Sequence, residues 1–325
     1  MKVIIMIHKN QEKGDHMKKN DLMLIFHNPD NYFFPFFKDI VYPPYEHREG
    51  TILYYIYRCM NICKLSISSF FWGSWKKQLR TVKQVIIFDY GYQNGMEKYI
   101  KKHNPSCEVY LFCWNKVSKV YNSIFNFTIK SNIYSTDIKD CKKYNLKFNH
   151  IFYPTELHSI WNESYRNNLY YLSSDKGRAY KVIEFKKILQ QSGLTCNIKL
   201  FSDNKDPNYR KSISEILIPS VIPYNDYINE IKTYGILLDI TQKGQAAFTF
   251  RVLESVIYSK KLITNNPLVK QTSFYNTNNI LVFDINKLPT VDEIKAFVAK
   301  PFIPYTNEQL YEIGFEHWLS GFSSH

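Results

Sequence analysis

Residues 235–264 read GILLDITQKGQAAFTFRVLESVIYSKKLIT. The apolar run 235–240 predicts a buried strand, residues 248–259 have helical length and apolar spacing, and residues 261–264 predict a second strand. Glycine and polar residues fill the loop between the first strand and the helix. A strand, a helix and a strand in this order indicate a βαβ unit, whose two strands lie parallel in one sheet.

The same alternation extends in both directions from this unit. In the second half, the predicted strands cover residues 169–173, 196–201 and 280–283, and the predicted helices cover 180–191 and 224–233. In the first half, the predicted strands cover 22–26, 82–88, 107–114, 133–136 and 150–153, and the predicted helices cover 51–65, 96–103 and 138–144. Both halves therefore predict parallel sheets wound by crossover helices, which is the α/β class.

The length of 325 residues favours two domains. The periodicity lapses over residues 154–168, so we place the boundary there and expect domains at 17–156 and 157–300. Residues 307–319 are predicted to form an amphipathic helix within a C-terminal segment, 301–325. Residues 1–16 are a leader to which the sequence assigns no role.

Composition narrows the setting of the protein. The formal net charge of +13 suggests a polyanionic partner, although a solvated lysine-rich surface explains it equally well. Six scattered cysteines without a CxxC pair indicate free thiols in a reducing compartment. No apolar run has the length of a membrane span, and the leader lacks the continuous apolar stretch of a signal peptide. We therefore expect a cytoplasmic protein.

Residues 173–178 (SSDKGR) form the first candidate ligand loop, between a predicted strand and a helix. Ligands of wound α/β sheets bind at the carboxyl ends of strands, where helix N-termini present unpaired N–H groups. Lys176 and Arg178, with the flexible Gly177, could hold a diphosphate there. An ordinary solvated turn is the equal alternative.

The loop 241–249 is the second candidate and leads into the helix that carries Arg251 and Glu254. Gly244 lets the backbone approach a ligand, and Arg251 adds a cation beside the helix N-terminus. Glu254 lies three residues beyond Arg251, on nearly the same helix face, where its carboxylate could accept both hydroxyls of a ribose. An intrahelical ion pair is the alternative.

The stretch GQAAFTFRVLESVIYSKKLITNNPLV (residues 244–269) resembles the signature of bacterial GT-B glycosyltransferases. YYLSSDKGR (170–178), PYNDYINEI (223–231) and IGFEHWLSGF (313–322) are similar to the same lineage, which acts in lipopolysaccharide, capsule or exopolysaccharide assembly. The resemblance covers the second half of the chain well and the first half only in rhythm. It implies two Rossmann-like domains facing each other across a cleft, with the C-terminal helix packing back toward the N-terminal domain.

The resemblance also implies an activity and its residues. The N-terminal domain would bind a glycan or lipid-linked glycan acceptor, and the C-terminal domain a UDP- or GDP-sugar donor. A peripheral position on the inner face of the cytoplasmic membrane is a further expectation. The implied donor contacts are Glu254 for the ribose, Thr249, Arg251, Lys176, Gly177 and Arg178 for the diphosphate, Tyr224 in the 220–224 loop for the base, and Gly244 and Gln245 in the loop beside them.

Two positions differ from the family pattern. Tyr258 and Ser259 stand where the family often has a small residue and glycine, and the second glutamate of many retaining members is absent, with Gln245 in that region. The stereochemical outcome therefore stays open. We expect Glu254→Ala and Arg251→Ala to weaken nucleotide binding and to leave the fold intact.

An inverting enzyme needs a general base on the acceptor side. Asp89, at the end of the predicted strand 82–88, is the first candidate, followed by Asp137 and His27. Strand-end carboxylates also commonly hold turns. No DxD pair occurs as a metal motif, so we expect helix N-termini and cations to stabilise the leaving diphosphate, without a metal or a cofactor.

Two other classes compete with the transferase. The positive charge and the many aromatic residues would suit a nucleic-acid-binding protein, but the cations are dispersed and no known motif is present. A Rossmann-type dehydrogenase would need a GxGxxG after an early strand, and none occurs.

Overall fold

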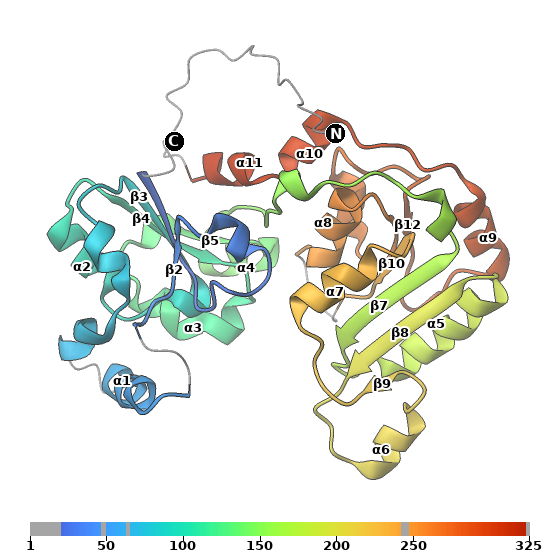
Figure 1. Ribbon diagram of the computed structural model, residues 1–325, viewed down its shortest axis with the longest axis horizontal. Coiled ribbons are helices and arrows are strands. Elements are labelled where there is room, and N and C mark those ends of the chain that lie inside the picture. Colours follow the sequence, from blue (N-terminus) through green and yellow to red (C-terminus); the bar gives the residue numbers. More distant parts are fainter. Residues whose placement is uncertain (1–20, 47–49, 63–65, 242–246, 323–325) are drawn as a thin grey trace, which may run out of the picture.

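The computed structural model describes residues 21–46, 50–62, 66–241 and 247–322. Within these ranges the chain forms two six-stranded parallel sheets, each in its own lobe, with the helices packed around them (Figure 1). The predicted α/β architecture of two Rossmann-like domains is thereby confirmed. The leader 1–16 lies outside the described residues, as do Gly244 and Gln245.

The first sheet has the strand order β2-β1-β3-β4-β5-β6. Its strands are β1 (Leu22–Ile25), β2 (Val41–Tyr42), β3 (Gln84–Phe88), β4 (Glu108–Cys113), β5 (Ile133–Ser135) and β6 (Lys147–Phe148). Its helices are α1 (Ile52–Ile62), α2 (Met96–His103), α3 (Val117–Asn126) and α4 (Ile138–Tyr144). Every residue of β1 and β3 is buried, which explains why these strands are continuous apolar runs and do not alternate.

The second sheet has the order β12-β11-β10-β7-β8-β9. Its strands are β7 (Asn168–Ser174), β8 (Thr195–Phe201), β9 (Leu217–Ile218), β10 (Ile236–Asp239), β11 (Lys261–Thr264) and β12 (Ile280–Val282). The helices are α5 (Ala179–Gln191), α6 (Pro207–Ser212), α7 (Tyr224–Ile231), α8 (Phe250–Ile257), α9 (Val291–Ala299), α10 (Asn307–Glu312) and α11 (Phe315–Ser320). The unit β10-α8-β11 matches the quoted stretch, and its two strands pair in parallel.

Two sequence predictions about element position are wrong. The strand expected at 150–153 is absent, and the edge strand β6 lies earlier, at Lys147–Phe148. Residues 151–153 are buried without being part of the sheet, because they pack in the core shared by the two domains. The expected helix 307–319 is broken into α10 and α11 at Gly314, whose backbone is extended.

The C-terminal helix packs back onto the N-terminal domain, as expected. Trp318 of α11 is fully buried, with its ring centroid 5.3 Å from that of Phe112 and 4.4 Å from that of Phe152. Its backbone carbonyl accepts a hydrogen bond of 2.9 Å from Asn149 Nδ2. One hydrophobic core therefore continues from the first sheet through this helix into the second domain.

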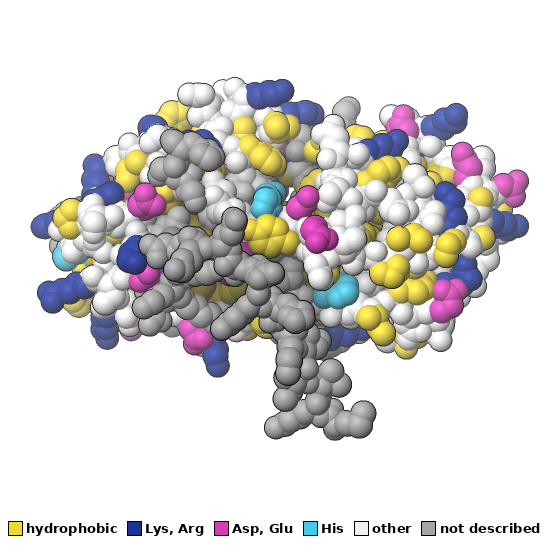
Figure 2. Space-filling model, turned by 90° about the horizontal axis from the view of Figure 1, so that it is seen from above, with side chains coloured by type: hydrophobic (Ala, Val, Ile, Leu, Met, Phe, Trp, Pro, Cys, Tyr) yellow, Lys and Arg dark blue, Asp and Glu magenta, His cyan; other side chains and the backbone are white. Residues whose placement is uncertain are grey.

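Charge is divided unequally between the two lobes. Residues 21–150 contain 18 Lys and Arg against 10 Asp and Glu, whereas residues 151–325 contain 19 against 17. Seen from above, Lys and Arg project along the outer edge of the N-terminal lobe, and both signs are mixed around the C-terminal lobe (Figure 2). None of the helices in the described part of the chain has the length and apolarity that a bilayer crossing demands.

Candidate functional site

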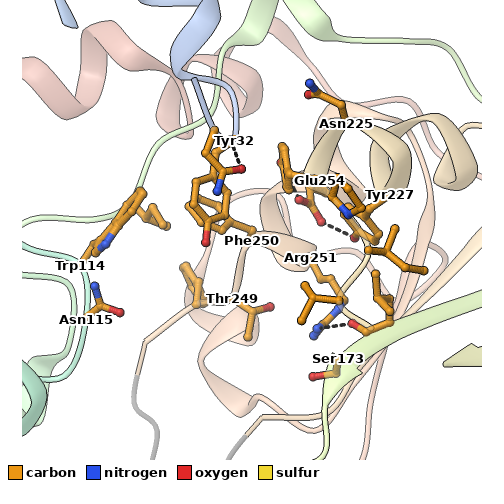
Figure 3. Close-up of a pocket in the computed structure, with 18 of the residues that line it drawn as sticks. Tyr32, Trp114, Asn115, Ser173, Asn225, Tyr227, Thr249, Phe250, Arg251 and Glu254 are labelled. Atoms are coloured by element: carbon orange, nitrogen blue, oxygen red, sulfur yellow. Dashed lines mark hydrogen bonds between the residues drawn. The ribbon is translucent and has the colours of Figure 1, made fainter. Parts of the chain in front are cut away.

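A cavity of about 720 Å³ lies between the two domains, at the carboxyl ends of their central strands. This is the edge where wound sheets bind ligands. Its N-terminal wall consists of His27, Asp30, Asn31, Tyr32, Tyr90, Trp114, Asn115 and Ile151. Its C-terminal wall includes Leu172, Ser173, Arg178, residues 221–225, Tyr227, Ile240, residues 248–251 and Glu254. Figure 3 shows Trp114 and Asn115 on one side and Thr249, Arg251 and Glu254 on the other.

Arg251 is tied to a buried carboxylate. Asp239, fully buried at the end of β10, accepts hydrogen bonds through Oδ1 from Thr249 Oγ1 at 2.9 Å and from Arg251 at 3.1 Å. Arg251 also donates to the Leu172 carbonyl at 2.7 Å. Although burial alone would lower the pKa of Arg251, Asp239 raises it. These contacts fix the guanidinium, with one edge in the cavity wall.

The contacts of Arg251 conflict with one sequence expectation. Its side chain is 16% exposed, and Asp239 has no exposed surface. Arg251→Ala would leave a buried carboxylate without its cation, which is strongly destabilising. The fold is therefore not expected to remain intact in that variant, because Arg251 supports the domain as well as lining the cavity.

Arg178 carries a charge that no carboxylate in the described part of the chain pairs with. Its guanidinium donates to the Ile240 carbonyl, to Ser173 Oγ at 2.6 Å and to the Ser174 carbonyl at 2.9 Å, all neutral oxygens. Among the described residues, Nε finds no hydrogen-bond partner. Burial lowers its pKa and the charge of Arg251 adds to this, while Tyr171 and the carboxylates of Asp239 and Asp175 oppose the shift. A half-buried guanidinium with neutral partners is prepared for an anion.

The other two residues of the SSDKGR loop that were predicted to bind a ligand lie elsewhere. Lys176 and Gly177 do not line the interdomain cavity; they line a smaller pocket of about 340 Å³ beside Ser202 and Tyr209. Asp175, which precedes them, closes the turn around them, since its Oδ1 accepts from the Arg178 and Ala179 amides at the start of α5. The structure thus separates Lys176 from Arg178, and a shared diphosphate contact does not fit this geometry.

Glu254 lies at the back of the cavity wall and is 1% exposed. Its Oε1 accepts from the Tyr224 hydroxyl at 2.8 Å, and its Oε2 from the Tyr227 hydroxyl at 2.5 Å. Burial raises the pKa of Glu254, against the two tyrosine hydrogen bonds. The ion pair with Arg251, the alternative to a ribose site, is not formed, since Arg251 pairs with Asp239. A ribose would have to share the Glu254 oxygens with the tyrosines or displace them.

Tyr224 links this carboxylate to the rest of the molecule. Its hydroxyl also bonds to the Tyr153 hydroxyl at 2.9 Å, and its ring centroid lies 5.1 Å from that of Tyr32 in the N-terminal domain. It begins helix α7, and the residues before it, 221–223, border the cavity. The tyrosine predicted to lie near the base therefore lies where the two domains meet.

Asp89 does not have the position that a general base needs. It is fully buried, and its carboxylate accepts from the Tyr90 amide at 2.7 Å and from the Asn115 amide at 2.8 Å. It is not among the residues that line the cavity. Burial raises its pKa to about 6. The contacts match the alternative considered for it, a strand-end carboxylate that holds a turn.

Of the other two candidates, only His27 faces the cavity. Asp137 caps helix α4, accepting from the Lys139 amide at 2.9 Å. His27 follows β1 and lies against Tyr90, with 5.6 Å between ring centroids. Asp30, which sequence reasoning did not single out, lines the same wall. Its position in the loop after the first strand is the sequence feature that could have marked it as a cavity residue.

Comparisons with known proteins give distant likenesses only. No family model matches the sequence, and no curated protein matches it. The solved structure of "AviGT4, a glycosyltransferase involved in Avilamycin A biosynthesis" is 10% identical, with 76% of this chain and 75% of that chain covered and a TM-score of 0.42. The solved structure of "TarM" is also 10% identical, with 75% of this chain and 55% of that chain covered and a TM-score of 0.44. This chain therefore spans about half the length of that one.

A third solved structure, "the Glycotransferase of kitacinnamycin", is also 10% identical, covers 76% of each chain and has a TM-score of 0.33. Likenesses at such TM-scores and identities carry no argument about activity. The evidence for the activity of this chain therefore lies in the residues that line its own cavity.

Proposed function

We propose that this protein is a glycosyltransferase that moves a sugar from a nucleotide-sugar donor to an acceptor held in the same cleft. One observation carries the proposal: the Arg178 guanidinium faces the interdomain cavity with only neutral hydrogen-bond partners. A diphosphate would supply the missing negative charge. Charge-assisted bonds to a phosphate are stronger than those to neutral oxygens.

The start of α8 adds to this anion site. Thr249 is the N-cap residue, but its hydroxyl donates to Asp239 and does not cap the helix. The first amides of α8 therefore face the cavity side without a cap from Thr249, and the helix dipole gives them partial positive charge. Arg178, this helix start and the edge of Arg251 would together stabilise the negative charge that develops on a leaving diphosphate.

The opposite wall is suited to the acceptor. In the proposed reaction an acceptor hydroxyl attacks the anomeric carbon of the sugar, the bond from that carbon to the diphosphate breaks, and the hydroxyl proton passes to His27. His27 follows β1 and lines the cavity together with Asp30. A neutral imidazole is a suitable base near neutral pH. The metal-independent character expected from the sequence is retained as part of this proposal.

The acceptor class and the location are finer parts of the proposal. The resemblance of residues 244–269 to the GT-B signature supports a growing lipopolysaccharide, capsule or exopolysaccharide chain as acceptor, presented at the inner face of the cytoplasmic membrane. Described cysteines, such as the buried Cys107 and Cys113, are free thiols. Free thiols agree with the cytoplasmic location that we propose.

A ligand screen tests the donor class. We expect UDP, GDP or dTDP to raise the melting temperature, because a ligand that binds only the folded state stabilises it. NAD, CMP, inorganic phosphate and a short DNA duplex serve as competing probes. A shift with NAD or with DNA alone would contradict the proposal, as would the absence of any shift with the nucleoside diphosphates.

A second assay tests transfer itself. Release of nucleoside diphosphate from the matching sugar donor should depend on an added glycan acceptor and should fall strongly in His27→Gln, while nucleotide affinity stays unchanged. Asp137→Asn is the control, since that side chain caps α4 away from the cavity. Unchanged turnover in His27→Gln would remove His27 as the base and leave the donor assignment standing.

A further inference from the structure

Helix α1 presents an apolar stripe to solvent. Ile52, Tyr55, Ile56 and Cys59 have the spacing i, i+3, i+4, i+7, so they share one face of the helix. All four are exposed; Ile52 is 79% and Ile56 45% exposed. In a globular protein such a stripe normally faces the core. Here it faces outward, at an edge of the N-terminal domain away from the sheet (Figure 1).

A further exposed aromatic belongs to the same region. Phe70 lies in the last turn of the 3-10 helix η3 (Ser66–Phe71), which packs against α1, and it is 81% exposed. Lys76 Nζ donates to the Ser69 carbonyl at 2.8 Å and to the Phe70 carbonyl at 3.4 Å. The Lys76 ammonium is therefore held at the backbone of the segment that carries Phe70.

Cations predominate in this region. Between Gly50 and Asp89 the sequence contains six Lys and Arg and no Asp or Glu. Of these cations, Lys77 and Arg80 are exposed, and they follow Phe70 closely in the chain. Outward apolar side chains are thus accompanied by an excess of cations; Glu46, whose amide bonds to the Phe71 carbonyl, is the nearby carboxylate whose charge acts on Lys76.

We propose that the α1 stripe and Phe70, with the cations at 76–80, dock the protein on an anionic phospholipid bilayer. Aromatic and aliphatic side chains insert at the headgroup boundary, and flanking cations are attracted to anionic headgroups. This surface rests on the proposed function only in that the protein is placed at a membrane.

Two other occupants fit the surface less well. A second copy of the chain, related by twofold symmetry, would bring the same cations against each other. A nucleic acid would use the cations but would leave Ile52, Ile56 and Phe70 in contact with phosphates and water, which gains nothing from their apolar surface. Only a bilayer uses both components.

Vesicle flotation tests the proposal with the full chain and no nucleotide. The protein should float with vesicles of equal parts phosphatidylcholine and phosphatidylglycerol, and not with phosphatidylcholine alone. Ile52→Ser with Ile56→Ser should lose most of the bound fraction. Ile160→Ser is the matched control, because Ile160 is 85% exposed and follows Ser159, whose amide bonds to the Ile257 carbonyl of α8 in the C-terminal domain.

The contribution of the cations to vesicle binding is tested separately. Lys77→Gln with Arg80→Gln should weaken partitioning about fivefold for each cation removed, while Lys187→Gln on the exposed face of α5 should have no effect. A dye on Cys59, in a Cys63→Ser, Cys196→Ser background, should become more fluorescent on anionic vesicles only.

Three results would overturn the proposal. The first is wild-type protein that stays unbound with anionic vesicles. The second is unchanged flotation of the double serine variant. The third is a dimer in solution that the serine substitutions dissociate. None of these measurements involves a sugar donor, so failure of the proposed transfer reaction would be seen separately.

Discussion

The two walls of the interdomain cavity are built differently. On the C-terminal wall, Arg251 and Glu254 are each held by buried partners, and Arg178 is held by three oxygens of its own domain. The N-terminal wall consists of loops after the strands and carries His27, Asp30 and the half-exposed Tyr90. A wall fixed in this way suits one constant charged group, such as a diphosphate. A wall of aromatic and polar loop residues suits a larger and more variable ligand.

Net charge does not follow this division. The N-terminal lobe carries most of the excess of cations, yet the anion site that we propose lies in the nearly balanced C-terminal lobe. A ligand site depends on a few desolvated charges, because charge on the exposed surface is screened by water and salt.

The largest expected effect comes from removing the cation of the rigid wall. Arg251→Ala should lower the free energy of unfolding by about 3–5 kcal/mol, because it leaves Asp239 buried and uncompensated. Urea denaturation measures the change. Combining Asp239→Asn with Arg251→Met should recover part of the loss. Wild-type stability in Arg251→Ala would show that the ion pair does not support the domain.

The next largest effect separates a structural carboxylate from a catalytic one. Burial raises the pKa of Asp89 from 3.8 to about 6, so its contribution to stability is fully present below pH 3.8 and is lost as the pH rises through 6. The loss amounts to about 3 kcal/mol. Compared with wild type, Asp89→Asn should lack this fall in unfolding free energy and should retain transfer activity.

The control for this experiment is Asp137→Asn. It shows how much the free energy of unfolding changes when an ordinary helix-capping carboxylate is replaced. Equal pH dependence of stability in wild type and Asp89→Asn would contradict the buried role. Loss of activity in a stably folded Asp89→Asn would return this residue to the list of possible bases.

A smaller effect concerns the charge that faces the cavity. Arg178→Ala should weaken binding of a nucleoside diphosphate by about 1.5–3 kcal/mol, roughly 10- to 150-fold. Lys176→Ala should leave the affinity unchanged, because Lys176 lines the separate small pocket. Titration calorimetry compares the two variants. An equal loss in both would restore the shared diphosphate contact that the sequence suggests.

The smallest effect tests whether a tyrosine occupies the ribose site. Tyr224→Phe removes the hydroxyl that bonds to Glu254 Oε1, so the free energy of unfolding should fall by about 1 kcal/mol and nucleotide affinity should rise several-fold. Tyr258→Phe is the control, since its hydroxyl bonds to Tyr153 and not to Glu254. Weaker binding in Tyr224→Phe would mean that the hydroxyl itself contacts the nucleotide.

The sequence alone determined the elements of the fold wherever the local signal is strong. Runs such as 85–88 and 236–238 are apolar because parallel strands are buried on both faces, and the predicted bounds of β11, Lys261–Thr264, match those observed. It also placed Arg178, Thr249, Arg251 and Glu254 near the ends of strands, where a wound sheet binds ligands.

Only the tertiary structure decided what those side chains do. It directed Arg178 into the cleft and Lys176 away from it, buried Asp89 under a turn, and brought Tyr224 and Tyr227 onto Glu254 from another helix. It also turned the apolar face of α1 outward. Local pattern fixes periodicity, but the partner of a side chain is set by chain segments tens of residues away, and no local pattern contains them.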